Sequence, residues 1–432
     1  MTKKTRDEGD TGTDTAPADP RRRRFMRDAA MLAGAAAAPG AVGSALAAGK
    51  PEPLAVPSWT TQQGSPILTP AYGMPSKFEK DVVRRPTDLT PTDLSSWSFT
   101  PLQDLNGMIT PNGLVYERHH GGVPAIHPSE HRLVVHGLVE QPLMFTIDEL
   151  MRFPQVSMIR FLECSGNTLT EWKSATGTTV QDTHGLLSCC EWTGVPLSTV
   201  LKEAGVQPEG KWILAEGADA AAMTRSIPMD KAMDDALLCY AQNGEALRPE
   251  QGYPLRLILP GYEGNTQIKW LRRLEVGSEP YMTREETSKY TDLMPDGTAR
   301  QFTYIMEAKS VITSPSGGQR VGGKGFHEIR GLAWSGRGRI TRVDVSVDGG
   351  RNWETAELDD PVLPRCVTRF RLPWRWSGAE AVLQSRAIDE TGYVQPTREQ
   401  LIDARGLDYV YHYNGIQSWH VAPDGEVTNV HA

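Results

Sequence analysis

The hydrophobic pattern of the chain changes near residue 300, and this change constrains the fold more than any other feature. Before it, short strand patterns such as "KWILAEGAD" and "DALLCYAQNG" alternate with short helix patterns such as "TGVPLSTVLKEAGV". After it, alternating strands and tight turns follow one another with almost no helix, as in "RITRVDVSVDGGRNWETAEL". We therefore predict an α+β domain over 99–300 and an immunoglobulin-like β-sandwich over 301–432.

The first 98 residues lack both patterns, and they divide near residue 47. A polar start is followed by the basic run "RRRRFMR" and by an Ala- and Gly-rich stretch that ends in "ALAA". This order is typical of a signal peptide, and "RRRFMR" matches the twin-arginine motif of proteins that are exported folded. We expect a twin-arginine signal peptide over 1–47, an extended Pro-, Ser- and Thr-rich N-terminal arm over 48–98, and a periplasmic location.

The charge and the residue types exclude several classes of protein. A formal net charge of −8 argues against nucleic-acid binding, although the basic run alone would also suit a nucleic-acid-binding arm. Gly and Pro interrupt the Ala-rich stretch, so we expect no stable membrane insertion. The histidines between residues 119 and 136 lack the spacing of zinc ligands.

The chain has five cysteines, and they differ in their surroundings. No C-x-x-C or C-x-x-C-H occurs, so we predict neither structural zinc nor haem on this chain. Cys239 and Cys366 fit core positions, and Cys189 and Cys190 are adjacent, where a bridge between them is hard to form. Cys164 ends the apolar run of "FLECSGNTLTEW" before a Ser-Gly-Asn turn. Its thiol would suit packing, a disulfide, a nucleophile or a metal ligand.

Several stretches between residues 100 and 432 resemble, in order, the sulfite oxidase family of molybdenum enzymes. They are "YERHHGGVPAIHPSEHRLVVHGLV", "FLECSGN", "EWTGVPLSTVLKEAG", "EGAD", "SIPMDKAM" and "QNGEALRPEQGYPLRLILPGYEGNTQIKWLRRLEV". Later, "GRGRITRVDVSVDGGRNWETAEL" resembles the dimerisation domain of that family. The resemblance implies a mixed α/β molybdopterin-binding catalytic domain of sulfite oxidase type over 99–300, an Ig-like dimerisation domain over 301–432, and a molybdenum-molybdopterin cofactor.

The resemblance also implies roles for particular residues. Cys164 is the cysteine of the family's C-x-G-N motif, which ligates molybdenum, and a soft thiolate suits such a metal. Arg256 matches a residue that holds the pterin phosphate. The implied cofactor-binding residues are Tyr116, Arg118, His120, Cys164, Asp219, Arg256 and Lys269. The implied catalytic residues are Cys164, Arg118 and Tyr290, the last from a loose alignment of "TSKYTDLMP".

The chain departs from the family pattern at three places. His119 stands where the family has Asn, and Gln251 stands where it often has His. The run Thr168-Leu169-Thr170 replaces arginines that help sulfite oxidases to bind their oxyanion. We expect weaker capture of a small dianion such as sulfite, with Arg118 left as a cationic contact.

Within the family, the chain resembles the molybdenum subunits of sulfane dehydrogenases in the Sox thiosulfate-oxidising system. The features are the export signal, the lack of a cytochrome domain, the motif without arginines and the C-terminal "YHYNGIQSWHV". The resemblance implies oxidation of the sulfane sulfur of a cysteine persulfide on a sulfur-carrier protein, with electrons passing to a c-type cytochrome subunit. It also implies a homodimer of this chain within a heterotetramer.

Three alternatives remain at this stage. One is a sulfite dehydrogenase that acts on free sulfite. Another is a reductase of the wider group that acts on oxidised methionines, which the predicted β-sandwich disfavours. The third is a metal-free binding or scaffold protein, which the presence of Cys164, Arg256 and Lys269 disfavours.

Overall fold

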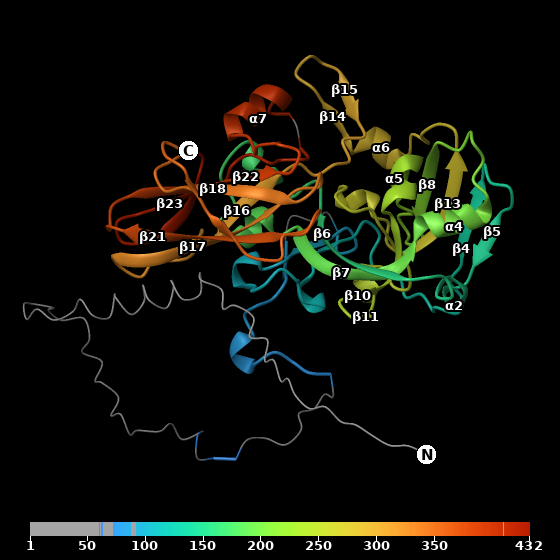
Figure 1. Ribbon diagram of the computed structural model, residues 1–432, viewed down its shortest axis with the longest axis horizontal. Coiled ribbons are helices and arrows are strands. Elements are labelled where there is room, and N and C mark those ends of the chain that lie inside the picture. The colour runs from blue at the N-terminus through green and yellow to red at the C-terminus, as the bar shows by residue number, and fades with distance from the viewer. Residues whose placement is uncertain (1–59, 61, 64–71, 88–91, 409) are drawn as a thin grey trace, which may run out of the picture. The chain divides into compact units, whose positions relative to one another are not determined.

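The computed structural model describes residues 60, 62–63, 72–87, 92–408 and 410–432. The predicted signal peptide over 1–47 and most of the arm before residue 72 lie outside the described residues. Pro75–Ala432 form one compact unit, drawn in Figure 1 from blue to red. Within the described residues, no helix combines the length and the apolar character that a membrane crossing requires.

The C-terminal end of the predicted arm is part of the folded unit. A 3-10 helix, η2 (Lys77–Glu79), is followed by β1 (Arg85–Pro86) and β2 (Trp97–Phe99). These two strands form a small antiparallel sheet with β3 (Glu117–Arg118). The arm therefore ends beside a segment that carries predicted site residues.

The α+β domain contains two sheets. The first has the order β11-β10-β7-β6, with β12 paired to β10, and consists of β6 (Val156–Glu163), β7 (Leu187–Pro196), β10 (Leu237–Gln242), β11 (Glu245–Ala246) and β12 (Arg256–Ile258). The second has the order β5-β4-β13-β8-β9 and consists of β4 (Leu133–Gly137), β5 (Leu143–Phe145), β8 (Trp212–Gly217), β9 (Thr224–Pro228) and β13 (Leu271–Gly277). Among these neighbours, β4 and β13 run parallel and the others run antiparallel.

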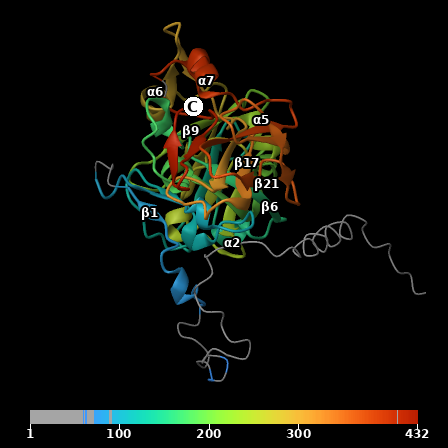
Figure 2. The same cartoon turned by 90° about the vertical axis from the view of Figure 1, so that its left-hand side faces the viewer.

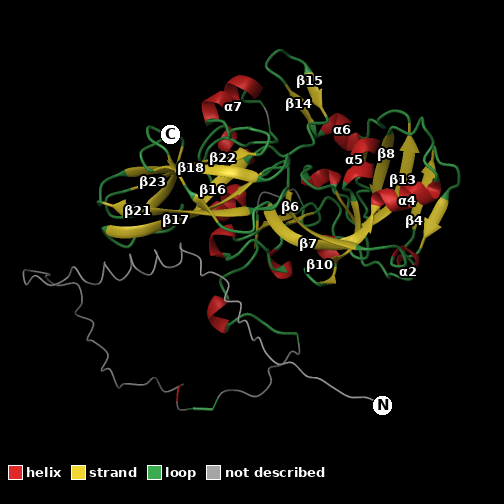
Figure 3. Ribbon diagram, viewed as in Figure 1, coloured by secondary structure: helices red, strands yellow, loops and turns green. Residues whose placement is uncertain are grey.

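Short helices lie beside these sheets (Figure 3). They are α2 (Ile147–Leu150), α4 (Leu197–Ala204), α5 (Met229–Asp234) and α6 (Arg284–Ser288). Another short helix, α3 (Val180–His184), instead contacts β2 and β16. The buried residues of α4 are Leu197, Val200, Leu201 and Ala204, which a helical repeat places on one face. Gly205 ends this helix at a positive φ of 68°, a conformation that glycine adopts without strain. The apolar faces of α4 and α5 and of both sheets form one core.

The second domain is a sandwich of two antiparallel sheets, as predicted. One has the order β16-β17-β21-β20 and consists of β16 (Lys309–Ser314), β17 (Gly325–Trp334), β20 (Glu357–Leu358) and β21 (Thr368–Trp376). The other has the order β19-β18-β22-β23-β24 and consists of β18 (Ile340–Ser346), β19 (Glu354–Thr355), β22 (Ala381–Asp389), β23 (Ser418–Val421) and β24 (Val427–Val430). Alternate residues of β21 are buried, and β17 and β21 lie side by side in both views (Figure 1, Figure 2).

Two elements extend this simple scheme. A hairpin of β14 (Thr291–Leu293) and β15 (Ala299–Gln301) precedes the sandwich, and α7 (Arg398–Arg405) interrupts its strands. Thr397 caps α7 and exchanges hydrogen bonds with Gln400, a capping box that fixes the start of the helix.

The two domains share part of one apolar core. Phe161, Leu187 and Cys189 of the first domain belong to the same buried cluster as Trp334 and Val367 of the second. The boundary near residue 300 therefore divides the sequence pattern, whereas the packing continues across it.

Candidate active site

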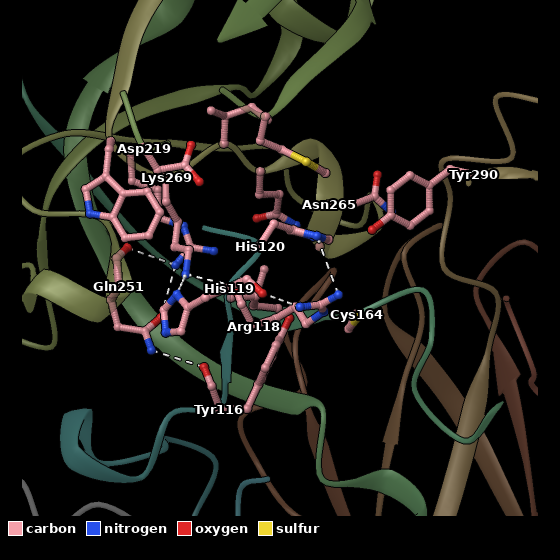
Figure 4. A pocket seen from close by; sticks show the side chains of 17 residues that line it. Tyr116, Arg118, His119, His120, Cys164, Asp219, Gln251, Asn265, Lys269 and Tyr290 are labelled. Carbon is pink, nitrogen blue, oxygen red and sulfur yellow. Dashed lines mark hydrogen bonds between the residues drawn. The ribbon is translucent and has the colours of Figure 1, made fainter. Parts of the chain in front are cut away.

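A cavity lies in the first domain, with an empty volume of about 660 Å³ that includes open solvent at its mouth (Figure 4). All eight site residues predicted from the sequence line it: Tyr116, Arg118, His120, Cys164, Asp219, Arg256, Lys269 and Tyr290. These residues come from separate strands and loops between residues 116 and 290, and the fold brings them together. His119, Gln251 and Asn265 also line the cavity.

Cys164 follows the last residue of β6 and begins a tight turn. Its backbone N–H donates to the carbonyl of Leu186 at 3.0 Å, and its carbonyl accepts from the N–H of Asn167 at 2.9 Å. The Asn167 side chain donates to Glu163 at 2.9 Å and accepts from the Leu186 N–H at 3.1 Å. Burial raises the pKa of the Cys164 thiol, which argues against an activated free nucleophile. The turn therefore holds the sulfur in a fixed position at the cavity.

A buried ion pair supports this turn from the second domain. Glu163 is fully buried and accepts from Lys309 Nζ at 3.1 Å and from Trp334 Nε1 at 2.6 Å. Lys309 also donates to Thr168 Oγ1 at 2.8 Å. Sequence reasoning missed this pair, because 146 residues separate its two charges.

A basic wall, formed by Arg118, Arg256 and Lys269, lies on one side of the cavity. Lys269 Nζ donates to the carbonyls of Arg118 and Glu250, each at 3.0 Å. Burial and the nearby Arg256 hold the pKa of Lys269 well below its usual range. Burial also lowers the pKa of Arg256. An anionic group in the cavity would stabilise the charged forms of these side chains.

His119 and Gln251, which depart from the family pattern, both hydrogen-bond to residues of the basic wall. His119 accepts from Lys269 at 2.9 Å through Nδ1, and its Nε2 is 2.6 Å from a carboxylate oxygen of Glu117. Gln251 donates to the carbonyl of Tyr116 at 3.0 Å, and its side-chain oxygen accepts from Arg256 at 3.1 Å. His119 and Gln251 therefore position the neighbouring wall residues.

The cavity offers polar groups that would suit the pterin. Among the described residues, Arg256 Nε and Asp219 Oδ1 are buried without a hydrogen-bond partner. One is a cationic donor for a phosphate, and the other is an acceptor for ring N–H groups. Burial and the Arg118 charge lower the pKa of His120 to about 3, so this ring is neutral and has an acceptor. Together with the soft thiol of Cys164, this donor set fits a molybdenum pyranopterin.

The opposite wall carries tyrosines and a buried charge network. The rings of Tyr290 and Tyr411 are 4.9 Å apart, and the Arg225 guanidinium lies 5.0 Å from the Tyr290 ring. Arg225 donates to Glu263 at 3.1 Å, and His412 Nε2 lies 3.1 Å from the other oxygen of that carboxylate. Burial raises the pKa of Tyr290, so its hydroxyl stays protonated.

The segment that carries Tyr411 and His412 comes from the second domain. The His412 N–H donates to the carbonyl of Ser165 at 2.8 Å, one residue after Cys164. Sequence reasoning used "YHYNG" as a mark of resemblance and assigned no role to its residues. The stretch "PGYEGN", which contains Glu263, likewise carries resemblance but no predicted role.

The run Thr168-Leu169-Thr170 lies outside the lining of the cavity, although the family pattern places substrate-binding arginines at these positions. None of the three residues is among the cavity-lining residues of the described chain. Thr168 adopts a positive φ of 69°, and its buried hydroxyl accepts from Lys309. Leu169 is 44% exposed, outside the cavity. The cationic side chain beside Cys164 is Arg118, which stacks 5.2 Å above the ring of Trp97.

Two family models match the chain. The oxidoreductase molybdopterin-binding domain matches residues 120–285, and the Mo-co oxidoreductase dimerisation domain matches residues 300–418. The mitochondrial sulfite oxidase of Drosophila melanogaster is 32% identical, over 70% of this chain and 58% of its own length. The sulfite oxidase of Gallus gallus is 32% identical over 67% of this chain and 68% of its own length.

Other relatives extend the comparison. The NADH nitrate reductase of Solanum lycopersicum is 33% identical, over 70% of this chain and 38% of its own length. The crystal structure of the sulfane dehydrogenase SoxCD from Paracoccus pantotrophus superposes with a TM-score of 0.87. That match is 52% identical and covers 89% of this chain and 100% of the other.

The chain spans 58% of the Drosophila sulfite oxidase and 65% of the mouse and human enzymes. The two family models together cover most of both domains, and the first includes Cys164. The chain therefore belongs to the sulfite oxidase family of molybdenum enzymes, and its cofactor is molybdenum-molybdopterin.

Proposed function

We propose that this protein oxidises the sulfane sulfur of a cysteine persulfide on a sulfur-carrier protein, and that its electrons pass to a c-type cytochrome subunit. The observation that carries the proposal is the 52% identity to the SoxCD sulfane dehydrogenase over the whole length of the matched chain. The sulfite oxidases share 32% identity over part of their length. The cavity of this chain also brings together a thiol, a basic wall and a tyrosine, Tyr290.

The cofactor residues divide by the chemistry that each would offer. Cys164 would ligate the molybdenum, and the cofactor, when bound, supplies oxygen-atom transfer and accepts two electrons. Arg256 would bind the pterin phosphate, with Lys269 beside it. The remaining proposed pterin contacts are Tyr116, Arg118, His120 and Asp219.

Arg118 and Tyr290 would hold the substrate sulfur. A persulfide is readily deprotonated, and Arg118 would pair with the resulting anion. The Tyr290 hydroxyl, kept protonated by burial, would donate a hydrogen bond to the same group. The Arg225 guanidinium on the Tyr290 ring would hold the tyrosine in place.

Free sulfite is a second candidate substrate, because Arg118 and Tyr290 also suit a small oxyanion and the sulfite oxidases are relatives. The Mo(V) electron paramagnetic resonance signal separates the two. We would add either sulfite or a persulfide-loaded carrier protein to purified holoenzyme, with Cys164→Ser as the test variant and Cys239→Ser as its control. Cys239 is buried outside the cavity.

We expect the persulfide-loaded carrier to produce the signal in wild type and Cys239→Ser, and Cys164→Ser to lose it. Preferential turnover of free sulfite would instead assign a sulfite dehydrogenase. Protein that contains no molybdenum after growth with molybdate, and gives no signal with either donor, would leave a metal-free scaffold.

The proposal includes a periplasmic location, reached by twin-arginine export, and a homodimer within a heterotetramer with the cytochrome subunit. The domain boundaries at 47, 98 and 300 belong to the same proposal. The dimerisation model over 300–418 supports pairing through the sandwich. Analytical ultracentrifugation of this chain with and without the cytochrome subunit tests the assembly. Fractionation of cells that express wild type or Arg22→Lys/Arg23→Lys tests the export.

A further inference from the structure

Two buried cysteines face each other where the two domains meet. Cys189 lies on β7 of the first domain, and Cys366 lies just before β21 of the second, 177 residues later. Their sulfur atoms are 3.3 Å apart. Both thiols are free, and each side chain is buried in the shared core.

The backbones around this pair are held in place. The Cys189 N–H donates to Thr110 Oγ1 at 3.1 Å, and its carbonyl accepts from the Thr110 N–H at 2.7 Å. On the other side, the carbonyl of Arg365 accepts from the Phe161 N–H at 3.1 Å. To form a disulfide, the two sulfur atoms need to approach only from 3.3 Å to about 2.05 Å.

The neighbouring thiol of Cys190 points elsewhere. Successive side chains of a strand face opposite sides, and Cys190 accepts from Gln242 Nε2 at 3.1 Å. Cys366 is therefore the partner of Cys189, and a bridge between Cys189 and Cys190 is disfavoured.

The surroundings favour a thiolate within the pair. The hydrogen bond from Cys189 lowers the pKa of Cys366 although burial opposes it, and the Val367 N–H and Arg160 act in the same direction. By contrast, burial raises the pKa of Cys239 far above its usual range. Thiolate character is what makes a cysteine pair open to oxidation.

A second, narrow cavity borders Cys189. It has an empty volume of about 280 Å³, and its lining includes Leu102, Met108, Thr110, Cys189, Val367 and Arg369. Cys189 borders this narrow space and its sulfur contacts that of Cys366, so an oxidant that reaches Cys189 is next to Cys366. The narrow space excludes bulky oxidants, and hydrogen peroxide is among the smallest.

We infer that Cys189 and Cys366 are a redox-reactive pair that hydrogen peroxide converts into a disulfide joining the two domains. The Cys366 thiolate attacks one peroxide oxygen, the O–O bond breaks, and the departing hydroxide takes a proton to become water. The resulting sulfenic acid is then attacked by the Cys189 sulfur, which loses its proton as a second water leaves. Two thiols and one peroxide give one disulfide and two waters, and the pair loses two electrons.

Mass spectrometry of the full-length holoenzyme tests the inference. Aliquots are treated with increasing concentrations of hydrogen peroxide and are then denatured in the presence of iodoacetamide, which alkylates free thiols. Intact masses and peptide maps are recorded without reductant. We expect two of the five cysteines to escape alkylation, with a linked peptide about 2 Da lighter than its two reduced parts. Later addition of a thiol reductant should restore full alkylation.

Variants assign the bridge to this pair. Cys366→Ser should abolish the linked peptide, whereas Cys239→Ser should form it at the wild-type peroxide concentration. Full alkylation of wild type after peroxide treatment, or a linked peptide that contains Cys190, would overturn the inference. Because the primary result is read on the wild-type protein, a variant that fails to fold does not remove the test.

Discussion

The buried Glu163–Lys309 pair makes a quantitative prediction about how the second domain supports the cavity. Lys309→Met removes the cation and keeps much of its volume, so the Glu163 carboxylate remains buried with the donors of Asn167 and Trp334. Loss of one partner from a buried ion pair costs about 3–5 kcal/mol. Since two donors remain on Glu163, we expect the low end, about 3 kcal/mol of unfolding free energy.

Urea unfolding followed by tryptophan fluorescence measures this loss. The double variant Glu163→Gln/Lys309→Met removes both charges, so it should recover about 2 kcal/mol relative to Lys309→Met. Lys202→Met is the control, because Lys202 is exposed on α4. Equal stability of wild type and Lys309→Met, or a double variant no better than the single one, would refute this reasoning.

Three further predictions concern the walls of the cavity. Burial would raise the pKa of Glu263, but Arg225 outweighs it and holds this pKa at about 2, below the ordinary 4.5. The Glu263 carboxylate should therefore contribute about 3 kcal/mol to the free energy of unfolding above pH 4.5. This contribution should disappear as the pH falls toward 2. Glu263→Gln should therefore lower stability in urea at pH 7 much more than at pH 3, and an equal loss at both values would contradict the assignment. Arg256→Met should at least halve the molybdenum content of the purified protein, measured by plasma mass spectrometry, whereas exposed Arg300→Met should leave it unchanged. Tyr290→Phe should lower kcat with a persulfide-loaded carrier by roughly 10- to 100-fold at unchanged molybdenum content. An unchanged kcat would remove Tyr290 from the catalytic residues.

Local sequence patterns account for the elements and for much of the cavity. The change from mixed to alternating periodicity near residue 300 predicts the two domains. The family resemblance carried by the motifs around Cys164, Arg256 and Lys269 predicts residues that the fold places together. The motif around Cys164 also contains a residue that stabilises its turn. The Asn of the Cys164 turn bonds back to Glu163 and to Leu186.

The parts that sequence reasoning missed depend on distant contacts. No periodicity links Glu163 with Lys309, or Ser165 with His412, because these pairs form only when the domains pack. The run Thr168-Leu169-Thr170 predicts weaker capture of a small dianion, but it does not predict that the Thr168 hydroxyl accepts a hydrogen bond from Lys309. Helix α7 is different, since its Thr397 and Gln400 are a recognisable capping box within the sequence.

The position of Tyr411 and His412 has a consequence for biosynthesis. Tyr411 packs on Tyr290, which lines the cavity and precedes Tyr411 by 121 positions along the chain. At about 5–20 residues per second, a ribosome needs roughly 6–24 s to make that stretch. During this interval the nascent chain already contains Cys164 and the basic wall but lacks the last segment. The order of translation thus leaves Tyr290 and the turn after Cys164 without these packing partners while the proposed cofactor ligands already exist.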